Sequence, residues 1–503
     1  MADRTQKSGT VPHPRKIPRF DGPLTAEALG EVFRDCVDFT RREVELAGLG
    51  RLSLCYLGGM VRMERVSDYV LRPLAEDRRL RQCRTMGEAM ARMEGGALYN
   101  LGTARRDTLD QAAADLVAGW CLLFFPGEAS ALSLFTGTEE KRAVSAPAGE
   151  TVLKGARDGF VESVRTNTSI VRRHLKAPEL RIREQTVGRQ SLTLVDVLYM
   201  EGLTDLALVE QVWDKLADMD VDGVFSTGGI EEYLVPAHRT PFPLVQYTER
   251  SDRFCAGLCE GRVGLLIDGV PLGYLTPAVL GNFLQAPQDK STSWLLATGL
   301  TLLRYGCMLL TLFLPALYVA MVTFHQEMIP TRLALSIIAA KQDVPFRSAF
   351  EVIVLLLAFE ILQEAGLRLP QSIGQTVSII GGLVVGSAAV EAKIISPAVL
   401  IVVAIAGIAG YTMPSQELAG ALRLWRFLLA ALASAAGLFG AVMGAAALVV
   451  HLAGLESFGV PYLTPFAVSA GAQAREHAFL RRPLPQVKER PPALHPLDRR
   501  KQR

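Results

Sequence analysis

The sequence predicts an α/β soluble amino-terminal domain, made of two related α/β subdomains, followed by an all-α polytopic membrane domain. Charges of both signs are dense from residue 1 to about 293, whereas long apolar stretches dominate from about 305 to 453. Within the charged half, two strand-like motifs recur at nearly equal spacing, as a duplicated unit would produce. The expected organisation is a flexible segment (1–44), subdomain 1 (45–150), a linker helix region (151–189), subdomain 2 (190–293), a transmembrane domain of about four to six helices (294–465) and a basic cytoplasmic tail (466–503).

The first repeated motif is an alternating apolar stretch that closes on glycine. Leu54–Met60 (LCYLGGM) resembles Val197–Leu203 (VLYMEGL). Each alternates as a strand does and is followed by a run with helical periodicity, residues 62–74 in one copy and 204–219 in the other. The pair predicts a strand, a glycine turn and a helix in each copy.

The second repeated motif comes later in each copy. Residues 120–127 (WCLLFFPG) resemble residues 262–269 (RVGLLIDG), and each predicts a strand that leads through a glycine-containing turn into another strand. From the tyrosine of the first motif to the closing glycine of the second there are 71 residues in one copy and 70 in the other. This agreement in spacing indicates two related subdomains.

The soluble half shows no catalytic or metal-binding motif. It lacks GxxxxGK[ST], a GxGxxG after a strand, HExxH and GxSxG, so we expect no enzyme activity, no cofactor and no metal. Asp268-Gly269 is interpreted as a hairpin turn rather than as a metal or catalytic carboxylate. Residues 158–175 are expected to form a helix with several basic side chains, either a solvated linker or a functional basic face.

Charge and cysteine usage restrict the compartment and the partners. A net charge of +2 gives no indication of nucleic-acid binding. The seven cysteines form no CxxC pair, which favours buried free thiols in a reducing compartment. Residues 1–30 show no apolar core with a cleavage site, so the amino-terminal domain is expected in the cytoplasm.

Four apolar stretches are long enough to cross a membrane, which requires about 20 residues. They are Tyr305–Phe324, Ile373–Val390, Ile394–Thr412 and Phe427–Ala453. A fifth stretch, Val352–Ile361, is short and bracketed by glutamates, and could be re-entrant, interfacial or sheltered. The basic tail prefers the cytoplasm. With both ends there, the number of crossings is even, so four or six crossings fit and five is disfavoured.

Two stripes of small residues predict close packing between helices, within one subunit or between subunits. They are Gly374, Ser378, Gly382 and Gly386 in the second span, and Ala436, Gly440 and Gly444 in the last.

Polar side chains near the spans are candidates for a pore or a gate. Glu360 and Glu364 lie one helical turn apart, and Gln375, Thr376 and Ser378 add polarity to the second span. In an oligomer the two glutamates could form a carboxylate ring that attracts cations. The alternative is an ion pair between Glu364 and Arg368 on an interfacial helix.

Several phrases occur in a specific order along residues 52–465. They are Arg157–Glu162, Tyr247-Thr248-Glu249-Arg250, Glu260-Gly261-Arg262, Ile267-Asp268-Gly269, Glu327–Thr331, Arg368-Leu369-Pro370, Ser396-Pro397 and Ser457–Tyr462. Together they resemble the A subunit of GerA-type spore germinant receptors. The motif residues singled out are Glu249, Arg250, Glu260, Arg262, Asp268 and Pro330. The chain departs from the family pattern after Arg250, where Ser251 and Asp252 follow, and at Asp289-Lys290-Ser291 before the first span.

The resemblance implies a membrane subunit of a nutrient germinant receptor in the spore inner membrane, surrounded by lipid. Such subunits act with a transporter-like B subunit and a C subunit lipoprotein, and nutrient binding leads to release of monovalent cations and then dipicolinate. The family is similar to an oligomeric, ligand-gated cation channel with the A subunit as pore former, so a homo-oligomer is expected. The alternatives are a non-conducting scaffold that transmits a signal, and a small-solute transporter, for which ten or more spans would be expected.

Overall fold

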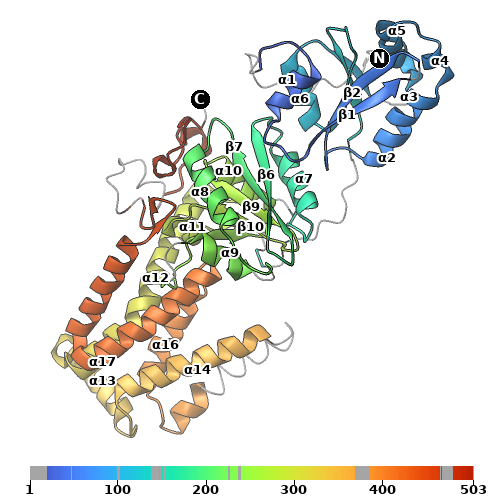
Figure 1. Ribbon diagram of the computed structural model, residues 1–503. Coiled ribbons are helices and arrows are strands. Elements are labelled where there is room, and N and C mark those ends of the chain that lie inside the picture. The colour runs from blue at the N-terminus through green and yellow to red at the C-terminus, as the bar shows by residue number, and fades with distance from the viewer. Residues whose placement is uncertain are drawn as a thin grey trace, which may run out of the picture.

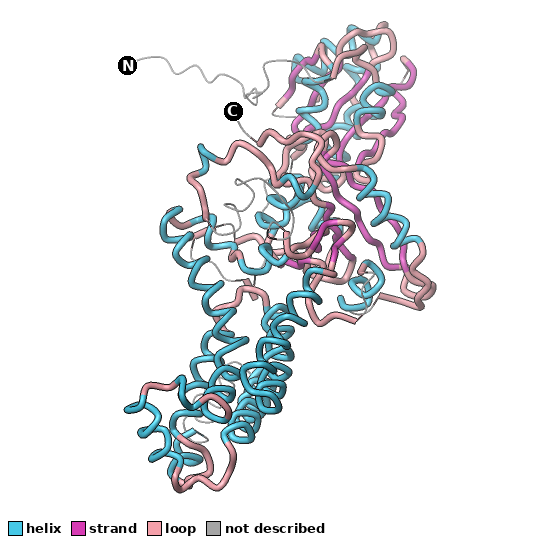
Figure 2. Tube along the Cα trace, turned by 90° about the vertical axis from the view of Figure 1, so that its left-hand side faces the viewer, coloured by secondary structure: helices cyan, strands magenta, loops and turns pink. Residues whose placement is uncertain are grey.

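The computed structural model describes residues 20–46, 48–98, 102–137, 147, 149–150, 154–155, 157–224, 227–235, 239–368, 386–464, 466 and 480–501. Two α/β units lie one after the other at one end of the molecule, and a helical bundle extends from the second unit (Figure 1). Figure 2 shows the same division from the side, with the long strands in the two units and helices in the bundle. The fold class predicted from the sequence is therefore confirmed.

The first unit is a five-stranded antiparallel sheet with helices on both faces. Its strands are β1 (Phe39–Leu46), β2 (Gly50–Leu57), β3 (Thr103–Arg106), β4 (Trp120–Phe124) and β5 (Ala131–Phe135), in the order β1-β2-β4-β5-β3. Its α-helices are α1 (Ala26–Val32), α2 (Met63–Val66), α3 (Arg72–Glu76), α4 (Arg78–Arg81), α5 (Met86–Arg92) and α6 (Leu109–Val117), with π-helical turns at Ser67–Leu71 and Met93–Ala97. Helices α2–α5 cover one face of the sheet, and α1 and α6 cover the other.

The second unit repeats this architecture. Its strands are β6 (Leu180–Val187), β7 (Thr193–Met200), β8 (Gln246–Thr248), β9 (Val263–Ile267) and β10 (Gly273–Thr276), in the order β6-β7-β9-β10-β8. Its helices are α7 (Val164–His174), α8 (Leu206–Ala217), α9 (Thr227–Leu234), α10 (Ser251–Leu258) and α11 (Leu280–Leu284), with a 3-10 turn at Pro287–Ser291. Helices α8 and α9 pack on one face and α7 and α10 on the other.

The two sheets agree in strand order and also in register. Ser53 opposes Phe124 in the first sheet, and Asp196 opposes Leu266 at the corresponding place in the second. The turn glycines agree as well, since Gly59 and Gly202 have φ of 77° and 72°, and Gly127 and Gly269 both have φ of 83°. Such left-handed turns favour glycine. The repeated motifs therefore mark two copies of one fold.

Both sheets begin before the boundaries expected at residues 45 and 190. The first strands, β1 and β6, start at Phe39 and Leu180, and β6 lies in the segment assigned to a linker helix region. These are edge strands with alternating charged side chains, FTRREVEL and LRIREQTV. Because an edge strand has a neighbouring strand on one side only, more of its residues reach solvent, as Arg41, Arg42 and Glu43 do in β1. Such strands lack the apolar run that marks the central strands.

The first unit is joined to the edge of the second sheet. Val37 N donates to Ile182 O at 2.9 Å, and Ile182 N donates to Asp35 O at 3.0 Å, which extends the β6 edge by one short parallel bridge. Arg172 on α7 reaches across to Asp38 with two bonds of 2.8 and 2.9 Å. The guanidinium is fully buried and the carboxylate is 5% exposed.

The helical bundle consists of long apolar helices. They are α12 (Trp294–Thr323), α13 (Thr331–Lys341), α14 (Ser348–Arg368), α16 (Pro397–Gly410) and α17 (Gln416–Ala453), with a 3-10 turn at Gln326–Met328. Among the described residues, α12 and α17 are long and apolar enough to cross a membrane, and α16 is a shorter apolar helix. The predicted span Tyr305–Phe324 coincides with most of α12, whereas Ile373–Val390 lies largely outside the described residues. The stretch Val352–Ile361 is part of the 21-residue helix α14.

The stretch Phe427–Ala453, expected as one span, is broken. Backbone angles leave the helical region at Ala436 and Gly437, where φ of Gly437 is +61°. A Cβ on Gly440 would overlap the carbonyl oxygen of Leu432, and one on Gly444 would lie 2.7 Å from Leu429. Residues 8 and 15 positions apart cannot touch in a straight helix, where they would be about 12 and 22 Å apart along the axis. Helix α17 is therefore a hairpin with arms 416–435 and 438–453 (Figure 1).

The chain returns to the second unit after α17. The short strands β11 (Glu456–Ser457) and β12 (Val460–Pro461) lead to Tyr462, whose carbonyl accepts from Leu280 N at 3.0 Å. The described part of the tail, 480–501, with 3-10 turns at Leu484–Gln486 and Pro492–Leu494, also folds onto this unit: Leu497 N donates to Leu203 O at 2.9 Å. The α/β units and this part of the tail thus lie at the same end of the bundle.

Candidate functional site

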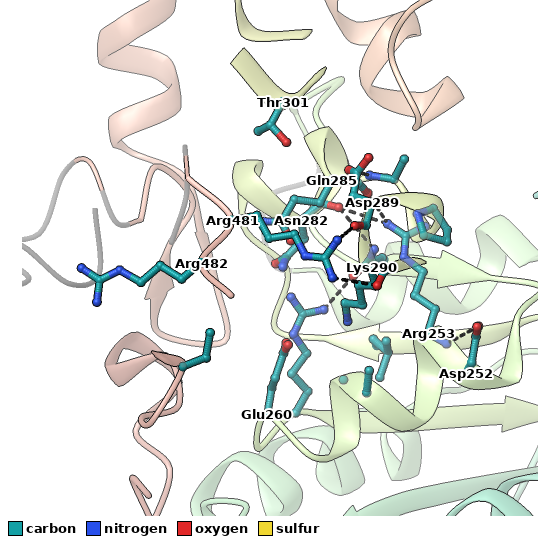
Figure 3. A pocket seen from close by; sticks show the side chains of 18 of the residues that line it. Asp252, Arg253, Glu260, Asn282, Gln285, Asp289, Lys290, Thr301, Arg481 and Arg482 are labelled. Carbon is teal, nitrogen blue, oxygen red and sulfur yellow. Dashed lines mark hydrogen bonds between the residues drawn. The ribbon is translucent and has the colours of Figure 1, made fainter. Parts of the chain in front are cut away.

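A cavity of about 440 Å³ opens where the second unit, the start of α12 and the tail meet (Figure 3). We call it the juxtamembrane cavity. Its walls come from β8, α10, the turn before β9, β10, α11, the turn at Pro287–Ser291, α12 and the tail segment 480–501. Two residues of the family motif, Glu260 and Arg262, line it.

The floor of the cavity is fixed by ionic contacts to the first long helix. Asp289 accepts two bonds from Arg304 on α12, at 2.5 and 2.9 Å, and both side chains are buried. Arg481 of the tail donates to the carbonyl oxygens of Thr292 and Lys290, each at 2.7 Å, and to that of Asp289. The tail is thereby attached to the turn that precedes α12, as Figure 3 shows.

Arg262 is the most deeply buried cation of the cavity wall. The residue is 2% exposed and follows Gly261, whose φ of +98° shapes the turn into β9. Its Nη1 donates to Gln246 Oε1 at 2.7 Å, and its Nε has no hydrogen-bond partner. Within the part of the chain that the structure describes, no carboxylate pairs with it. Burial lowers the pKa of the Arg262 guanidinium.

Positive charge exceeds negative charge in the cavity wall. The wall holds six cationic side chains, Arg253, Arg262, Lys290, Arg481, Arg482 and Lys501, against three acidic ones, Asp252, Glu260 and Asp289. Two of the acids are already paired, Asp252 with Arg250 at 2.6 Å and Asp289 with Arg304. Arg253 is likewise paired with Glu150 at 2.5 Å. The arrangement suits an anion rather than a cation.

The other motif residues of the soluble half support the second unit. Asp268 stands in the β9–β10 turn and its Oδ1 accepts from Val164 N at 3.0 Å, at the start of α7. Glu249 Oε2 accepts from Gly149 N at 3.0 Å. Arg250 is held by Asp252. The motif residue of the membrane half, Pro330, precedes the first residue of α13.

In the bundle, Glu360 is paired across to α17. Its oxygens accept from Arg423 Nη1 at 3.0 Å and from Arg426 Nη2 at 2.7 Å. Glu364, one turn later on α14, is exposed. The two glutamates share a helix but not an environment, and the partners of Glu360 were missed because they lie more than 60 positions away in the sequence. The signal available was the pair of arginines just before the last apolar stretch, since charges beside a span require partners.

A second ionic contact joins helices at the far end of the bundle. Glu351 Oε2 accepts from Ser396 N at 2.8 Å, and its Oε1 lies 3.2 Å from Lys341 Nζ. The carboxylate is fully buried. It links α13, α14 and the start of α16, a role that the sequence pattern around Glu351 does not indicate.

The remaining candidates fall in different places. Gln375, Thr376, Ser378, Gly374 and Gly382 lie outside the described residues. Gly386 faces Leu400 of α16, because a Cβ on it would lie 3.3 Å from Leu400 Cδ1. Gly440 and Gly444 lie in the contact between the arms of α17.

The seven cysteines are free, and five are buried while Cys259 and Cys307 are partly exposed. Burial raises the pKa of Cys55 and of Cys121 to about 12. These two thiols are therefore unreactive side chains of the core.

The comparison with protein families decides the assignment. Residues 27–493 match the model of the Bacillus/Clostridium GerA spore germination protein. The chain belongs to the GerA spore germination protein family. The GerA match covers both α/β units, the bundle and most of the tail.

GerA relatives align over most of their length. The chain is 34% identical to spore germination protein KA of Bacillus subtilis (strain 168), covering 90% of this chain and 82% of that one. It is 33% identical to spore germination protein GerLA of Bacillus cereus, covering 92% and 93%. It is also 35% identical to an uncharacterized membrane protein, YfkQ, of Bacillus subtilis (strain 168), covering 91% and 88%. The crystal structure of the N-terminal domain of the A subunit of the Bacillus megaterium spore germinant receptor GerK3 aligns with 50% of this chain and 93% of that domain, at 24% identity and a TM-score of 0.41.

Proposed function

We propose that this GerA-family chain is the A subunit of a nutrient germinant receptor, and that as a homo-oligomer it forms or lines a ligand-gated cation channel. The match to the GerA model over residues 27–493 carries the receptor assignment. The proposal places the chain in the spore inner membrane, with its α/β units in the cytoplasm, beside a B subunit and a C subunit lipoprotein. It assigns the chain no enzymatic reaction.

Three features of the bundle support a membrane role. Helix α12 has the length and apolarity of a membrane span, and α17 is equally apolar but divides into the arms 416–435 and 438–453. Helix α17 turns back on itself, so its two arms enter and leave the bundle at the end nearest the α/β units. The family motif before Tyr462 then ties the end of α17 to α11 of the second unit. A movement of the second unit would therefore act on both α12 and α17.

Glu360 is the group we propose for gating. Ionisable side chains within a bundle are costly and tend to be functional. In this conformation its carboxylate forms ion pairs with Arg423 and Arg426, so its negative charge is neutralised and does not attract cations. We propose that this ion pair belongs to a non-conducting state, and that Glu360 and Glu364 line the pathway when it opens.

The same ion pair favours a second candidate function, a non-conducting scaffold that transmits the signal from the B subunit. A carboxylate satisfied by two arginines within one chain can be purely structural. A transporter is the third candidate, and no observation in the described bundle favours it.

Potassium efflux from spores separates these candidates. A strain lacking this chain is complemented with wild type, with Glu360→Gln/Glu364→Gln, or with Glu391→Gln, a matched control at an exposed position before the turn that leads to α16. We expect nutrient-triggered efflux to be lost in the null strain and restored by wild type and by the control. We expect the double variant, at normal protein level, to change the efflux rate or the ion preference.

Two other outcomes are informative. Normal efflux in the null strain would contradict the receptor role under the conditions used. Loss in the null strain with wild-type behaviour of the double variant would keep the receptor and transfer the conduction pathway to other residues, as the scaffold function requires.

A further inference from the structure

We propose that the juxtamembrane cavity is a binding site for the phosphate group of an organic anion. The inference goes beyond channel formation, because it concerns a ligand of the A subunit itself and can be measured as binding.

Uncompensated charge is the first reason. The cavity wall holds six cationic and three acidic side chains, and two of the acids are already paired with arginines behind the wall. One of the cations, Arg253, is likewise paired with Glu150. Lys290 and Lys501 stand exposed at the wall, and no described carboxylate pairs with either. A concave surface with one sign of charge concentrates ions of the opposite sign.

The buried guanidinium of Arg262 is the second reason. Removing a charge from water without a partner of opposite charge is strongly unfavourable. Arg262 is 2% exposed, has one neutral acceptor in Gln246, and leaves its Nε without a partner. Because the same residue lines the cavity, an anion held there would lie beside the guanidinium and offset its buried charge.

The number and spread of donors favour phosphate. A guanidinium and two ammonium groups line the cavity: Arg262 from the turn before β9, Lys290 from the turn before α12 and Lys501 from the tail. A tetrahedral phosphate accepts charge-assisted bonds from several directions at once. A cavity of about 440 Å³ is larger than one phosphate ion needs and lies in the range of sites for small organic ligands.

The position allows two sources for the phosphate. Thr301 of α12 lines the cavity, and the same helix exposes Trp294, Leu295 and Leu296 at its start. Exposed tryptophan beside a membrane helix is typical of the water–lipid interface. The phosphate could therefore belong to a lipid headgroup at that interface or to a soluble organic phosphate from the aqueous side.

Binding to the purified full-length chain tests the site. In detergent, sn-glycerol 3-phosphate is titrated while the midpoint of thermal unfolding is followed. In parallel, the chain is placed in nanodiscs of phosphatidylcholine with and without phosphatidylglycerol. We expect saturable stabilisation by the soluble phosphate, by phosphatidylglycerol, or by both, and the responding arm identifies the source.

Variants tie the binding to the cavity. Lys290→Ala/Lys501→Ala should weaken the apparent affinity about tenfold or more, since each removes a charge-assisted bond. Arg262→Gln should do the same and Arg262→Lys less so. The matched control, Lys154→Ala/Lys176→Ala, removes two exposed lysines that lie away from the cavity and should bind as wild type.

Either of two results would overturn the proposal. One is no saturable stabilisation of the wild-type chain by either source. The other is unchanged affinity in the double lysine variant. Because both lysines are exposed, that variant tests the site even if Arg262→Gln fails to fold.

Discussion

The two α/β units have the same strand order and register but differ in the polarity of their interiors. Where the first unit has Ser53, the second has a buried aspartate, Asp196, and where the first has Trp120, the second has Arg262. Trp120 packs edge-on against Phe135 with ring centroids 5.4 Å apart, whereas Arg262 bonds to Gln246 and faces the juxtamembrane cavity.

The difference shows where a duplicated fold has acquired special chemistry. The second unit contacts the first unit through its β6 edge and the helical bundle through its β8 and α11 side. Its buried charges lie toward these neighbours: Arg172 pairs with Asp38 of the first unit, and Arg262 lies near the tail and α12. The buried acid Asp115 of the first unit instead pairs with Arg106 of the same unit, at 2.6 Å. The two copies of one scaffold thus differ in where they place buried charge.

Among the substitutions that test this difference between the units, Arg172→Leu should have the largest effect on the free energy of unfolding. The substitution leaves Asp38 buried without a partner and severs the ionic link between the units. Removing one member of a buried pair costs about 3–5 kcal/mol. We expect a loss of that size in the free energy of unfolding of the full-length chain, measured by chemical denaturation.

Two further variants serve as controls for the loss of stability in Arg172→Leu. Arg189→Gln breaks an exposed pair with Asp220, in which both side chains are about two-thirds exposed, and should cost less than about 1 kcal/mol. Asp38→Leu/Arg172→Leu removes both charges and should recover much of the loss. A change below about 1 kcal/mol in Arg172→Leu would mean that backbone pairing at the β6 edge holds the units together without the ion pair.

The next effect concerns Asp196, which has an uncharged counterpart in Ser53. Its side chain is fully buried, and burial raises the pKa of its carboxyl to about 6. The Thr168 hydroxyl lies 2.9 Å from Val164 O and 2.8 Å from Asp196 Oδ2. Thr168 donates to Asp196 Oδ2, and Arg165 Nη1 lies 3.7 Å from the same oxygen. Both contacts lower the pKa of Asp196, but burial outweighs them, so the folded carboxyl keeps its proton up to about pH 6.

This protonation predicts how stability depends on pH. The unfolded carboxyl has a pKa of about 3.9. Between about pH 3.9 and about pH 6, Asp196 keeps its proton in the folded chain, whereas the same carboxyl has lost its proton in the unfolded chain. The contribution of Asp196 is therefore fully present below about pH 4 and declines as the pH rises to about 6, by about 3 kcal/mol in total.

Asp196→Asn should remove this dependence. We expect the stability difference between wild type and variant to change by about 2 kcal/mol between pH 4 and pH 7, measured by denaturation at each pH. Asp220→Asn, at an exposed site, should follow the wild-type curve. Parallel curves for wild type and Asp196→Asn would show that the carboxyl is ionised in the folded chain throughout that window.

The sequence predicted the central strands that the two copies share, but it did not predict the edge strands through which the two units are joined. The central strands were recognisable because they are largely apolar stretches followed by turn glycines, alternating in β2 and β7 and continuous in β4 and β9. The edge strands β1 and β6 were missed because both carry several charged side chains, which interrupt the apolar pattern.

The bundle and the cavity depend on contacts that local patterns do not encode. The turn at Gly437 lies in an alanine- and glycine-rich apolar run with no charged residue to mark it. Glu360 and its arginines, and Arg262 and the tail, are brought together only by the tertiary fold. Arg262 was singled out by the family motif, but its burial and its place in a cavity wall could not be read from the chain.

The smallest expected effect concerns the helix that follows the third strand of each copy. In the first unit Thr108 caps α6, and its hydroxyl oxygen accepts from Gln111 N at 3.4 Å. The corresponding cap of α10 is Arg250, which makes no side-chain cap bond and instead pairs with Asp252. Thr108→Ala should therefore cost about 1 kcal/mol in the free energy of unfolding, while Thr108→Ser should keep the cap and remain within about 0.5 kcal/mol of wild type. If Thr108→Ala is as stable as wild type, then α6, like α10, starts where it does because of its buried apolar face, and the cap of the first copy contributes nothing that the second copy lacks.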